Sequence, residues 1–573
     1  MEMVFLVSIG IAAFFALILL GAGVRSLLRR GESEVGGWEL RGGGRRIRAV
    51  ASSTLAEGLR MRVALVFLLV MVVAIPTLAA TGEGDGTILG RVQMFIGYAF
   101  GFSSFLLAVL TIILSTRSLS AEIAGRQIFG TVSKPIPRWQ VIAGKWLGIT
   151  ALNVVMLAFA VFAAYAGVRY LVWDTQHRLQ TELVSRGGLT EPQAAGCLDS
   201  IRRVRGPGGI GVDSPIIPAM ADALGWSNEQ VTELLLLLPD QTKSELRRLD
   251  QVRRHVLAAR ASVRPKVRDV TQAVKARLAE LRERGEVTDE DEHRARRELF
   301  RVHREAQRSV GPFRVRPWVL QGPPPVESDE FLVSVRFKLE GFTPPAVSTE
   351  GMLLQENTLL GQWRVGDPES PSAFFWPESP QPKPLSTFVE FEIPSHVIDE
   401  DGVVRIEFAN VDPRRVTARF APNGLEVLYA AGSFEGNLIR AAVAMLMPLM
   451  VLAAAGVCFS TFCTFPVAFL VTLTLYAAAS TSGFLYEAVG VSDSVFSLDP
   501  TTVDLVRKWI ADVVFKIVSI STLDAPDRLV EGRLVSWGDL STEALHTLVF
   551  RCGPFLATAV FIFRRRELAA IIV

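Results

Sequence analysis

The side chains that most often carry catalysis are scattered in this sequence. Its six histidines and four cysteines show no spacing typical of a metal site, and no Ser/His/Asp set or catalytic carboxylate pair stands out. The nearest approach to a phosphate-binding loop is Gly144-Lys145, but Trp146 follows where Ser or Thr is required, and Trp139 replaces the first glycine. The sequence therefore predicts neither an enzyme nor an ATPase, and no cofactor in this chain.

A charged segment between two apolar stretches has the spacing of a mechanical element. Residues 118–132 can form a short amphipathic helix that ends near Gly130, in which Glu122 and Arg126 stand four positions apart in the favourable order. The Lys-Pro-Ile-Pro-Arg run at 134–138 follows and is stiff, because proline fixes φ and disfavours helix before it. We interpret this as a helix and elbow that could pass force from a motor, with an ordinary interfacial loop as the alternative.

One arginine lies inside an apolar stretch. Arg551 stands close to Pro554 in the last stretch, where a charge is costly and usually faces a partner or a wet cavity. A place on a transport path, a structural ion pair and snorkelling to the interface are the three alternatives. Arg440, near the end of its own stretch, is predicted to snorkel.

The composition indicates that the apolar stretches of this chain lie in a membrane. Half of the 573 residues are apolar, and the mean hydropathy is +0.33. A helix needs about 20 apolar residues to cross about 30 Å of hydrocarbon. The predicted spans are Val4–Val24, Val63–Ala80, Val92–Leu114, Trp146–Val172, Leu438–Phe459, Phe465–Leu485 and Leu545–Phe563. The sequence therefore predicts a polytopic α-helical membrane protein with about seven spans.

The distribution of basic residues predicts the orientation. Arginine and lysine gather in the segment 25–62, in the loop 117–145 and at Arg564–Arg566. All three fall on one side if every stretch crosses, and that side is the cytoplasm. We therefore predict a bacterial inner-membrane protein with its N-terminus outside and its C-terminus in the cytoplasm. Residues 1–24 are a retained anchor, and residues 25–62 a cytoplasmic basic linker with a connector helix.

The long charged region between the fourth and fifth spans is predicted to be extracytoplasmic. Residues 173–311 are rich in helix formers, with a capping-box spacing at Ser227 and Gln230. Acidic residues interleave the arginines there, which argues against nucleic acid. From 312 to 436 the apolar residues alternate with a period of two, as in Val333, Val335 and Phe337. We therefore predict an inserted α+β domain that ends in a β-sandwich, acting as a binding module or as a spacer.

The remaining segments complete the predicted membrane core. Residues 63–172 hold the first three core spans and residues 437–573 the last three. Between the last two spans, apolar residues recur at helical spacing near 503–518 with five charges among them. That charge is incompatible with a comfortable span, so we predict an amphipathic helix in the outer interface.

Three of these segments resemble the ABC (ATP-binding cassette) transporter permeases of the type-two exporter class. The charged loop from Ser118 to Lys145 looks like their signature, residues 51–60 are similar to the connector along the inner leaflet, and residues 563–569 look like their C-terminal ending. The resemblance implies a six-span exporter core with 118–132 as its coupling helix. The extra first span and the large insertion depart from the minimal pattern. By this resemblance the ATPase-docking residues are Leu119, Glu122, Ile123, Arg126, Phe129, Lys134 and Arg138.

The leading hypothesis is a permease subunit that moves an unidentified substrate. The resemblance implies cytoplasmic ATPase subunits that bind the ATP, and a second permease subunit, identical or not. A ligand or envelope protein at the outer domain is a further candidate partner, beside the lipid bilayer. The rival hypothesis is a membrane-anchored extracytoplasmic binding or sensory protein whose spans are passive mounting.

Overall fold

The structure is a computed structural model that forms two compact units. The first comprises residues 1–199, 233–257 and 433–573, and the second residues 200–232 and 258–432. Residues that the structure describes are 39–82, 84, 87–125, 136–203, 216–240, 242–243, 245–246, 252–266, 269–285, 291–322, 333–342, 358–367, 374–393, 398–399, 401–496 and 525–565. The predicted first span, Val4–Val24, and the predicted interfacial helix near 503–518 lie outside them.

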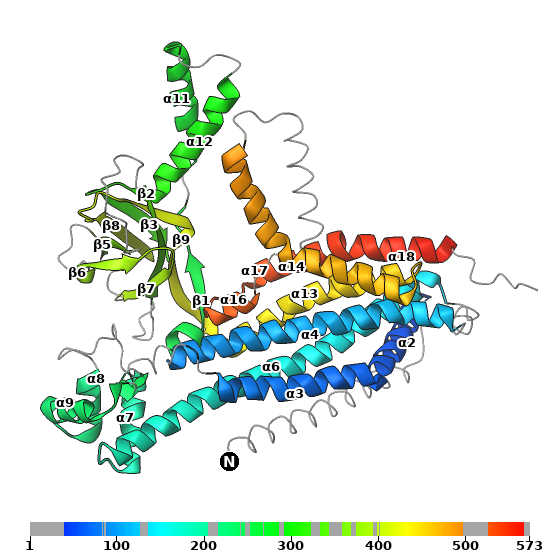
Figure 1. Ribbon diagram of the computed structural model, residues 1–573, viewed down its shortest axis with the longest axis horizontal. Helices are drawn as coiled ribbons and strands as arrows, with labels where there is room; N and C mark the ends of the chain where they lie inside the picture. Colours follow the sequence, from blue (N-terminus) through cyan, green and yellow to red (C-terminus); the bar gives the residue numbers. More distant parts are fainter. Residues whose placement is uncertain are drawn as a thin grey trace, which may run out of the picture. The chain divides into compact units, whose positions relative to one another are not determined.

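Long helices dominate the first unit (Figure 1). Short elements join them: α7 (Glu191–Arg203), α9 (Asn228–Leu237) and the π-helix η1 (Val252–Val256), and later α16 (Ala525–Val530), α17 (Trp537–His546) and the π-helix η3 (Thr547–Cys552). The long helices are α2 (Glu39–Arg60), α3 (Arg62–Thr81), α4 (Ile88–Ala124), α6 (Arg138–Ser185), α13 (Phe434–Ser460) and α14 (Phe465–Phe496), with α18 (Gly553–Arg565) near the end of the chain.

Six of the seven predicted spans coincide with described helices. Among the described residues, five helical stretches are long and apolar enough to cross a membrane: α3, α4, α6, α13 and the continuous run Trp537–Arg565. In the sixth, α14, the apolar portion with described side chains is the shorter Phe465–Thr481. The helices extend beyond the predicted spans because nothing in the flanking polar turns breaks them. The chain is a polytopic helical membrane protein.

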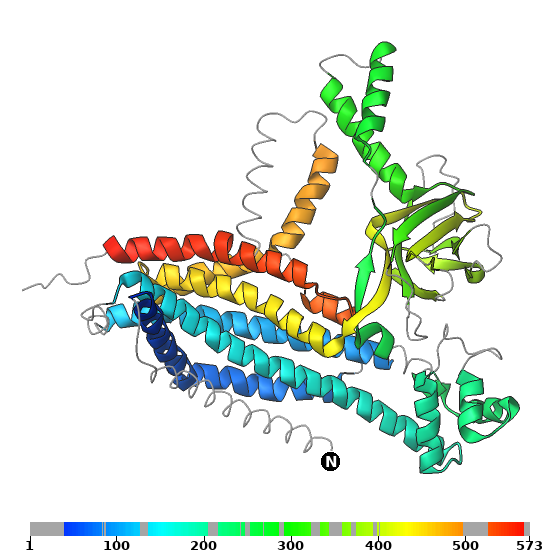
Figure 2. The same cartoon turned by 180° about the vertical axis from the view of Figure 1, so that it is seen from behind.

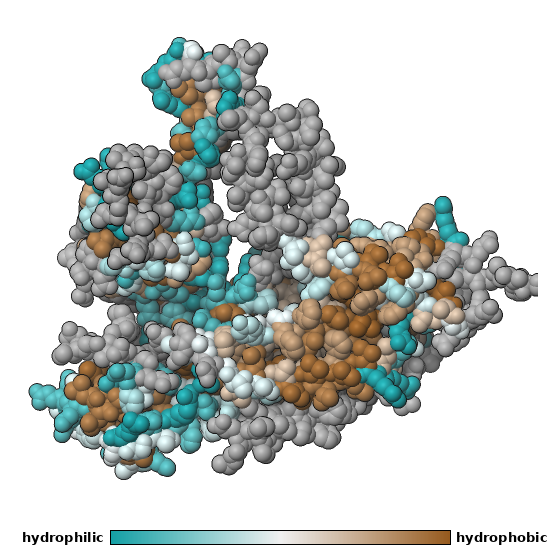
Figure 3. All heavy atoms as spheres, in the orientation of Figure 1, coloured by the Kyte–Doolittle hydropathy of each residue, from teal (hydrophilic) through white to brown (hydrophobic). Residues whose placement is uncertain are grey.

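Apolar side chains cover much of the outside of these helices. On α3, Leu65, Leu69 and Val73 are 50%, 62% and 58% exposed. Figure 3 shows the same tendency as a broad hydrophobic surface over the helical unit. So large an apolar surface is unfavourable in water, whereas the hydrocarbon chains of lipids can surround it without cost.

Local capping residues explain where several helices begin. The Thr87 hydroxyl accepts from the Gly90 amide at the start of α4, and the Ser433 hydroxyl from the Gly436 amide at the start of α13. The capping box predicted at Ser227 and Gln230 is confirmed, because each residue's amide donates to the other's side chain, at 3.0 and 3.3 Å.

The second unit is built around two β-sheets that pack on one core. Its described elements are α8 (Ile216–Leu224), α11 (Thr271–Glu283), α12 (Glu292–Arg308), β1 (Ala258–Val263), β2 (Ser309–Val310), β3 (Val315–Gln321), β4 (Val333–Phe342), β5 (Thr358–Val365), β6 (Phe374–Pro384), β7 (Phe388–Ile393), β8 (Val403–Asn410) and β9 (Thr417–Ser433). One sheet has the order β1-β9-β4-β7 with β2 also paired to β9, and the other has the order β3-β8-β5-β6.

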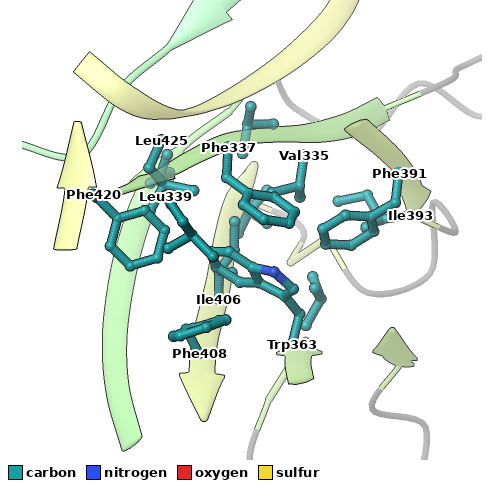
Figure 4. Close-up of a cluster of buried hydrophobic side chains, with 14 of the residues drawn as sticks. Val335, Phe337, Leu339, Trp363, Phe391, Ile393, Ile406, Phe408, Phe420 and Leu425 are labelled. Atoms are coloured by element: carbon teal, nitrogen blue, oxygen red, sulfur yellow. The ribbon is translucent and has the colours of Figure 1, made fainter. Parts of the chain in front are cut away.

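Alternation along the strands fills the space between the sheets with apolar side chains (Figure 4). Trp363 of β5 lies in the middle and is 1% exposed, with its ring centroid 4.8 Å from Phe337 of the facing sheet and 4.9 Å from Phe408 of its own. Each aromatic contact of this kind adds about 0.5–1.5 kcal/mol beyond the burial of its area. The alternation predicted at Val333, Val335 and Phe337 is therefore confirmed, since all three lie on β4 and are buried.

The sheets also use segments that the sequence pattern assigned to the helical half. The boundary predicted at residue 312 is wrong for β1 and β2, which lie before it and pair with β9. Residues 258–263 carry only one β-branched side chain, so their strand conformation follows from pairing and not from propensity.

A buried carboxylate ties the turn before β9 to β5. Asp412 is fully buried and accepts from the Leu360 amide at 3.0 Å and from the Arg414 guanidinium at 2.7 Å. The bond from Arg414 holds the pKa of Asp412 at about 2, below its ordinary value of 3.8. Because the folded-state pKa is the lower one, the stabilisation is present above about pH 4 and is lost as the pH falls toward 2.

We predict that Asp412→Asn lowers the stability of the protein by about 1.5–3 kcal/mol at pH 7, since the neutral amide loses the charge-assisted bonds. The difference from the wild type should shrink between pH 4 and pH 2. Thermal unfolding of the solubilised protein across this range measures both effects. Asp401→Asn, at an exposed turn, is the matched control and should change stability by less than about 0.5 kcal/mol. An equal effect of the two variants would contradict the proposed role of Asp412.

Candidate coupling site at the helix ends

The predicted coupling helix begins inside α4. Residues 118–124 continue the helix from Ile88 without a break, and Gly125 ends it by donating its amide to the Ala121 carbonyl at 2.8 Å. Thr116 and Ser120 can remain in a buried helix because their hydroxyls donate to the carbonyls four residues earlier. A separate helix over 118–132 that ends near Gly130 is thus wrong in its first half, and residues 126–135 lie outside the described chain.

Two of the predicted docking residues are packing residues. Leu119 is fully buried in a cluster with Ile142 and Ile149 of α6 and with Val457 of α13. Ile123 packs against the same cluster. The prediction that Leu119 contacts an ATPase is wrong, because no surface of its side chain is left to touch a partner.

Glu122 forms an ion pair within the bundle. The Lys145 ammonium donates to the Glu122 carboxylate at 2.7 Å and to the Ser118 carbonyl at 2.8 Å. Only 4% of the Lys145 side chain is exposed, against 23% of Glu122. One ammonium therefore binds both a carboxylate and the backbone near the C-terminal end of α4, where helix carbonyls carry partial negative charge.

Arg138 joins the start of α6 to the end of α18. Its guanidinium donates to the carbonyls of Phe563 and Arg564, at 2.6 and 3.0 Å, and lies over the Phe563 ring. These are helix-terminal carbonyls without partners inside their own helix. Arg138, predicted to dock an ATPase, thus binds within its own chain, while the predicted docking residues Arg126, Phe129 and Lys134 lie outside the described residues.

Two glycines let α2 approach α6 closely (Figure 2). A Cβ atom at Gly144 would lie 2.6 Å from Val50 Cβ, and one at Gly148 2.6 Å from the Ala51 carbonyl oxygen. This small-x-x-x-small spacing is a common way for membrane helices to pack backbone against backbone. The connector predicted at 51–60 is therefore part of a longer helix fixed to α6.

Further polar contacts join α6 to its neighbours. The Trp146 indole donates to the Met450 carbonyl of α13 at 3.0 Å, and the Thr111 hydroxyl of α4 bonds the Asn153 carboxamide at 2.9 Å in a fully buried position. We call this set the helix-end junction; it consists of Gly144, Lys145, Trp146, Gly148 and Asn153 of α6 together with their partners on α2, α4 and α13. Sequence reasoning missed its two glycines and its lysine as a set, although the spacing of Gly144 and Gly148 was a usable signal.

Arg551 forms a buried ion pair with Glu543. Its guanidinium donates to the Glu543 carboxylate at 2.6 Å, and the two side chains are 2% and 8% exposed. Both lie in the continuous helical run of α17, η3 and α18, and the π-turns of η3 bring the two residues together although they are eight positions apart. Of the three alternatives, this geometry favours structural pairing. Arg440 lies over the Trp537 ring at 5.2 Å.

Within the described part of the chain, no group of three or more His, Cys, Asp or Glu side chains could hold a metal ion. The chemistry available at the helix-end junction is ion pairing and close packing. It can hold helices together and transmit displacement between them.

The family model of the ABC-2 family transporter protein matches residues 7–185. Residues 7–185 are thus similar to the membrane domain of ABC-2 transporters. The match confirms the resemblance to ABC-2 type permeases, and it includes α2, α3, α4 and all of α6, hence both partners of the Lys145–Glu122 pair. The match supports a permease component of an ABC transporter. Searches of the curated proteins and of the solved structures found no match.

We predict that Gly148→Val lowers the stability of the solubilised protein by about 1–3 kcal/mol, because the new side chain overlaps α2. Gly101→Val in α4 is the matched control, since a Cβ there meets nothing within 4 Å. Melting temperatures by size-exclusion chromatography measure both. Equal melting temperatures would show that α2 does not pack closely on α6.

We predict that removing Glu122 is worse than removing Lys145. Glu122→Ala leaves an ammonium buried among apolar side chains, at a cost of about 3–5 kcal/mol. Lys145→Met leaves a carboxylate that water can reach, and the double variant should recover most of the loss. A double-mutant cycle of melting temperatures measures the coupling.

The control for this cycle is Glu182→Ala, which breaks the exposed pair with Arg186 and should cost less than about 1 kcal/mol. A Glu122→Ala variant as stable as Glu182→Ala would refute the importance of the buried pair.

Proposed function

We propose that this chain is the transmembrane permease subunit of an ABC exporter, coupled to a separate cytoplasmic ATPase in the bacterial inner membrane. The observation that carries the proposal is the helix-end junction, which fastens the helices on both sides of the charged loop at 126–135. A displacement applied to that loop would reach α4 and α6 directly, and α2 and α13 through them.

The absence of a phosphate-binding motif from the sequence supports a separate motor. In this proposal, ATP binding draws two ATPase subunits together and pulls on the loops of two permease subunits. The bundle then shifts between inward-facing and outward-facing states, because each rigidly fastened group of helices moves as a body. Outward transport follows from the resemblance to exporters, and the positive-inside pattern supports the cytoplasmic position of the loop.

We propose that the ATPase-docking surface contains fewer residues than the seven predicted from the sequence. Leu119, Ile123 and Arg138 are occupied within the chain, and Glu122 binds Lys145. We therefore assign these four the task of positioning the loop. Arg126, Phe129 and Lys134 remain the proposed contacts with the ATPase.

The second unit is the proposed extracytoplasmic insertion of this permease, with its two sheets forming a β-sandwich. The rival hypothesis of an anchored binding protein gives the membrane helices no task. A junction with buried charges and backbone-to-backbone packing is more than a passive anchor requires, which favours the permease.

We predict that Arg126→Ala/Phe129→Ala reduces co-purification of an ABC ATPase at least fivefold after gentle solubilisation from the native membrane. Fivefold corresponds to about 1 kcal/mol, a modest loss for an interface arginine and phenylalanine. Quantitative mass spectrometry of the co-purified proteins is the measurement. The matched control is Arg314→Ala/Phe313→Ala, an exposed pair in the second unit, which should leave ATPase recovery unchanged.

Two outcomes would overturn the proposal. One is recovery of the same ATPase amount with the double variant as with the wild type. The other is labelling of a cysteine placed at position 126 from outside the cell, because an external loop cannot meet a cytoplasmic motor.

A further inference from the structure

A basic groove in the second unit is lined by residues of both sheets. It has a volume of about 1160 Å³ and is bordered by β3 of one sheet and by β2 and β9 of the other. This exceeds the volume of most small-molecule pockets, which reach about 1000 Å³. The residues that give it character are Arg264, Lys266, Arg308, Arg314, Arg316 and Trp318.

The groove carries an excess of positive charge. Five of its described lining residues are cationic, and none is Asp or Glu. Arg264 lies 3.6 Å from the Glu426 carboxylate, and Arg316 donates to the Ser309 carbonyl at 2.8 Å. For Lys266, Arg308 and Arg314, no carboxylate among the described residues lies within ion-pair distance. Like charges gathered in a concave surface attract anions, because the field of each adds to that of the others.

Two aromatic residues, Trp318 and Phe420, line the groove. Trp318 is half-buried and packs edge-on against Phe420 with 5.1 Å between ring centroids, and the Arg316 guanidinium lies 5.9 Å from the Trp318 ring. A half-buried indole beside a guanidinium group suits a ligand that combines flat apolar surfaces with anionic groups. The C–H face of a sugar ring provides such a surface.

The backbone of β3 argues against a peptide ligand. The Arg314 carbonyl accepts from the Asn410 amide and the Gly322 amide donates to the Gly402 carbonyl, so even-numbered residues of β3 bond β8. Backbone groups alternate along an antiparallel strand, and the odd-numbered residues therefore face the open edge. Pro317 is one of them and has no N–H, so a peptide added as a further strand would lose a central hydrogen bond.

We propose that this groove binds an anionic oligosaccharide, a glycan chain that carries carboxylate, sulfate or phosphate groups. Sugar rings stack on Trp318 and the anionic groups bind Arg308, Arg314 and Lys266. The volume of the groove has room for several sugar units, and the proposed binding is independent of ATP and of the membrane helices.

The test uses the full-length protein in detergent and isothermal titration calorimetry. The probes are two anionic glycans, an oligogalacturonate of about eight units and a heparin-derived octasaccharide. Maltooctaose is the control for an uncharged glycan. Polyglutamate and single-stranded DNA are the controls for polyanions that are not glycans. We expect either anionic glycan to bind, maltooctaose to bind at least tenfold more weakly, and added salt to weaken binding.

Arg308→Gln/Arg314→Gln should reduce glycan affinity at least tenfold. The matched control, Arg284→Gln/Arg301→Gln, removes two exposed arginines of the same unit that each pair with a glutamate and lie outside the groove, and it should bind as the wild type does. Trp318→Leu should weaken glycan binding more than it weakens polyglutamate binding. Melting temperatures of all variants verify folding.

Failure of both anionic glycans to bind would overturn the proposal, as would equal loss of binding in the groove and control variants. Polyglutamate or DNA binding as tight as glycan binding would also overturn it, and would assign the groove to polyanions in general. None of these outcomes affects the permease proposal, which is tested by ATPase recovery.

Discussion

A lysine ammonium buried between two membrane helices sets the arrangement of the first unit. An isolated charge in apolar surroundings is costly, so Lys145 requires both the Glu122 carboxylate and the Ser118 carbonyl. That requirement fixes the end of α4 against α6 at one height and one rotation. Gly144 and Gly148 of α6 then let α2 approach closely, and Gly58 of α2 does the same where it faces Leu152 of α6.

The buried pair and the close packing have different mechanical meanings. Helices whose backbones are in contact resist sliding along one another, because a small displacement brings their atoms into overlap. An ion pair resists separation, because each partner left alone would be poorly solvated. Together they make the end of α4, the start of α6 and the middle of α2 a rigid group, while the Arg138 contact links that group to the end of α18. A switch between two states of the bundle would therefore occur by movement of such groups and not by bending within them.

The sequence predicts much of this fold because the dominant forces leave periodic traces. Hydropathy locates α3, α4, α6 and α13, and alternation locates β4, β7 and β8, since both reflect burial along a single element. Contacts between elements leave weaker traces. Leu119 has the same pattern whether it faces an ATPase or the bundle, and only the neighbouring helices decide. β1 has no strand signal of its own, because its conformation comes from β9, more than 150 residues later.

For the candidate site, too, the sequence predicts one part and only the fold shows the other. Glu122 was identifiable as important from its place in a charged loop, but its partner Lys145 is 23 positions away at the far end of that loop, and nothing in the sequence pairs the two. Arg551 was identifiable as an unusual charge, whereas its pairing with Glu543 depends on the π-turns of η3. Sequence thus shows which residues are unusual, and the fold shows with which atoms they interact.

The late position of β9 in the chain has a consequence for biogenesis. This strand pairs with β1, β2 and β4, so one sheet stays incomplete until residues near Ser433 leave the ribosome. α13 begins at the next residue, and its insertion must follow almost at once. The nascent chain therefore holds about 170 residues of unfinished β structure while its next hydrophobic helix enters the membrane, counting from β1 to β9. Chaperones that protect open sheet edges would act in this interval, and a pause in translation after α13 would lengthen the time available for the sheet to close.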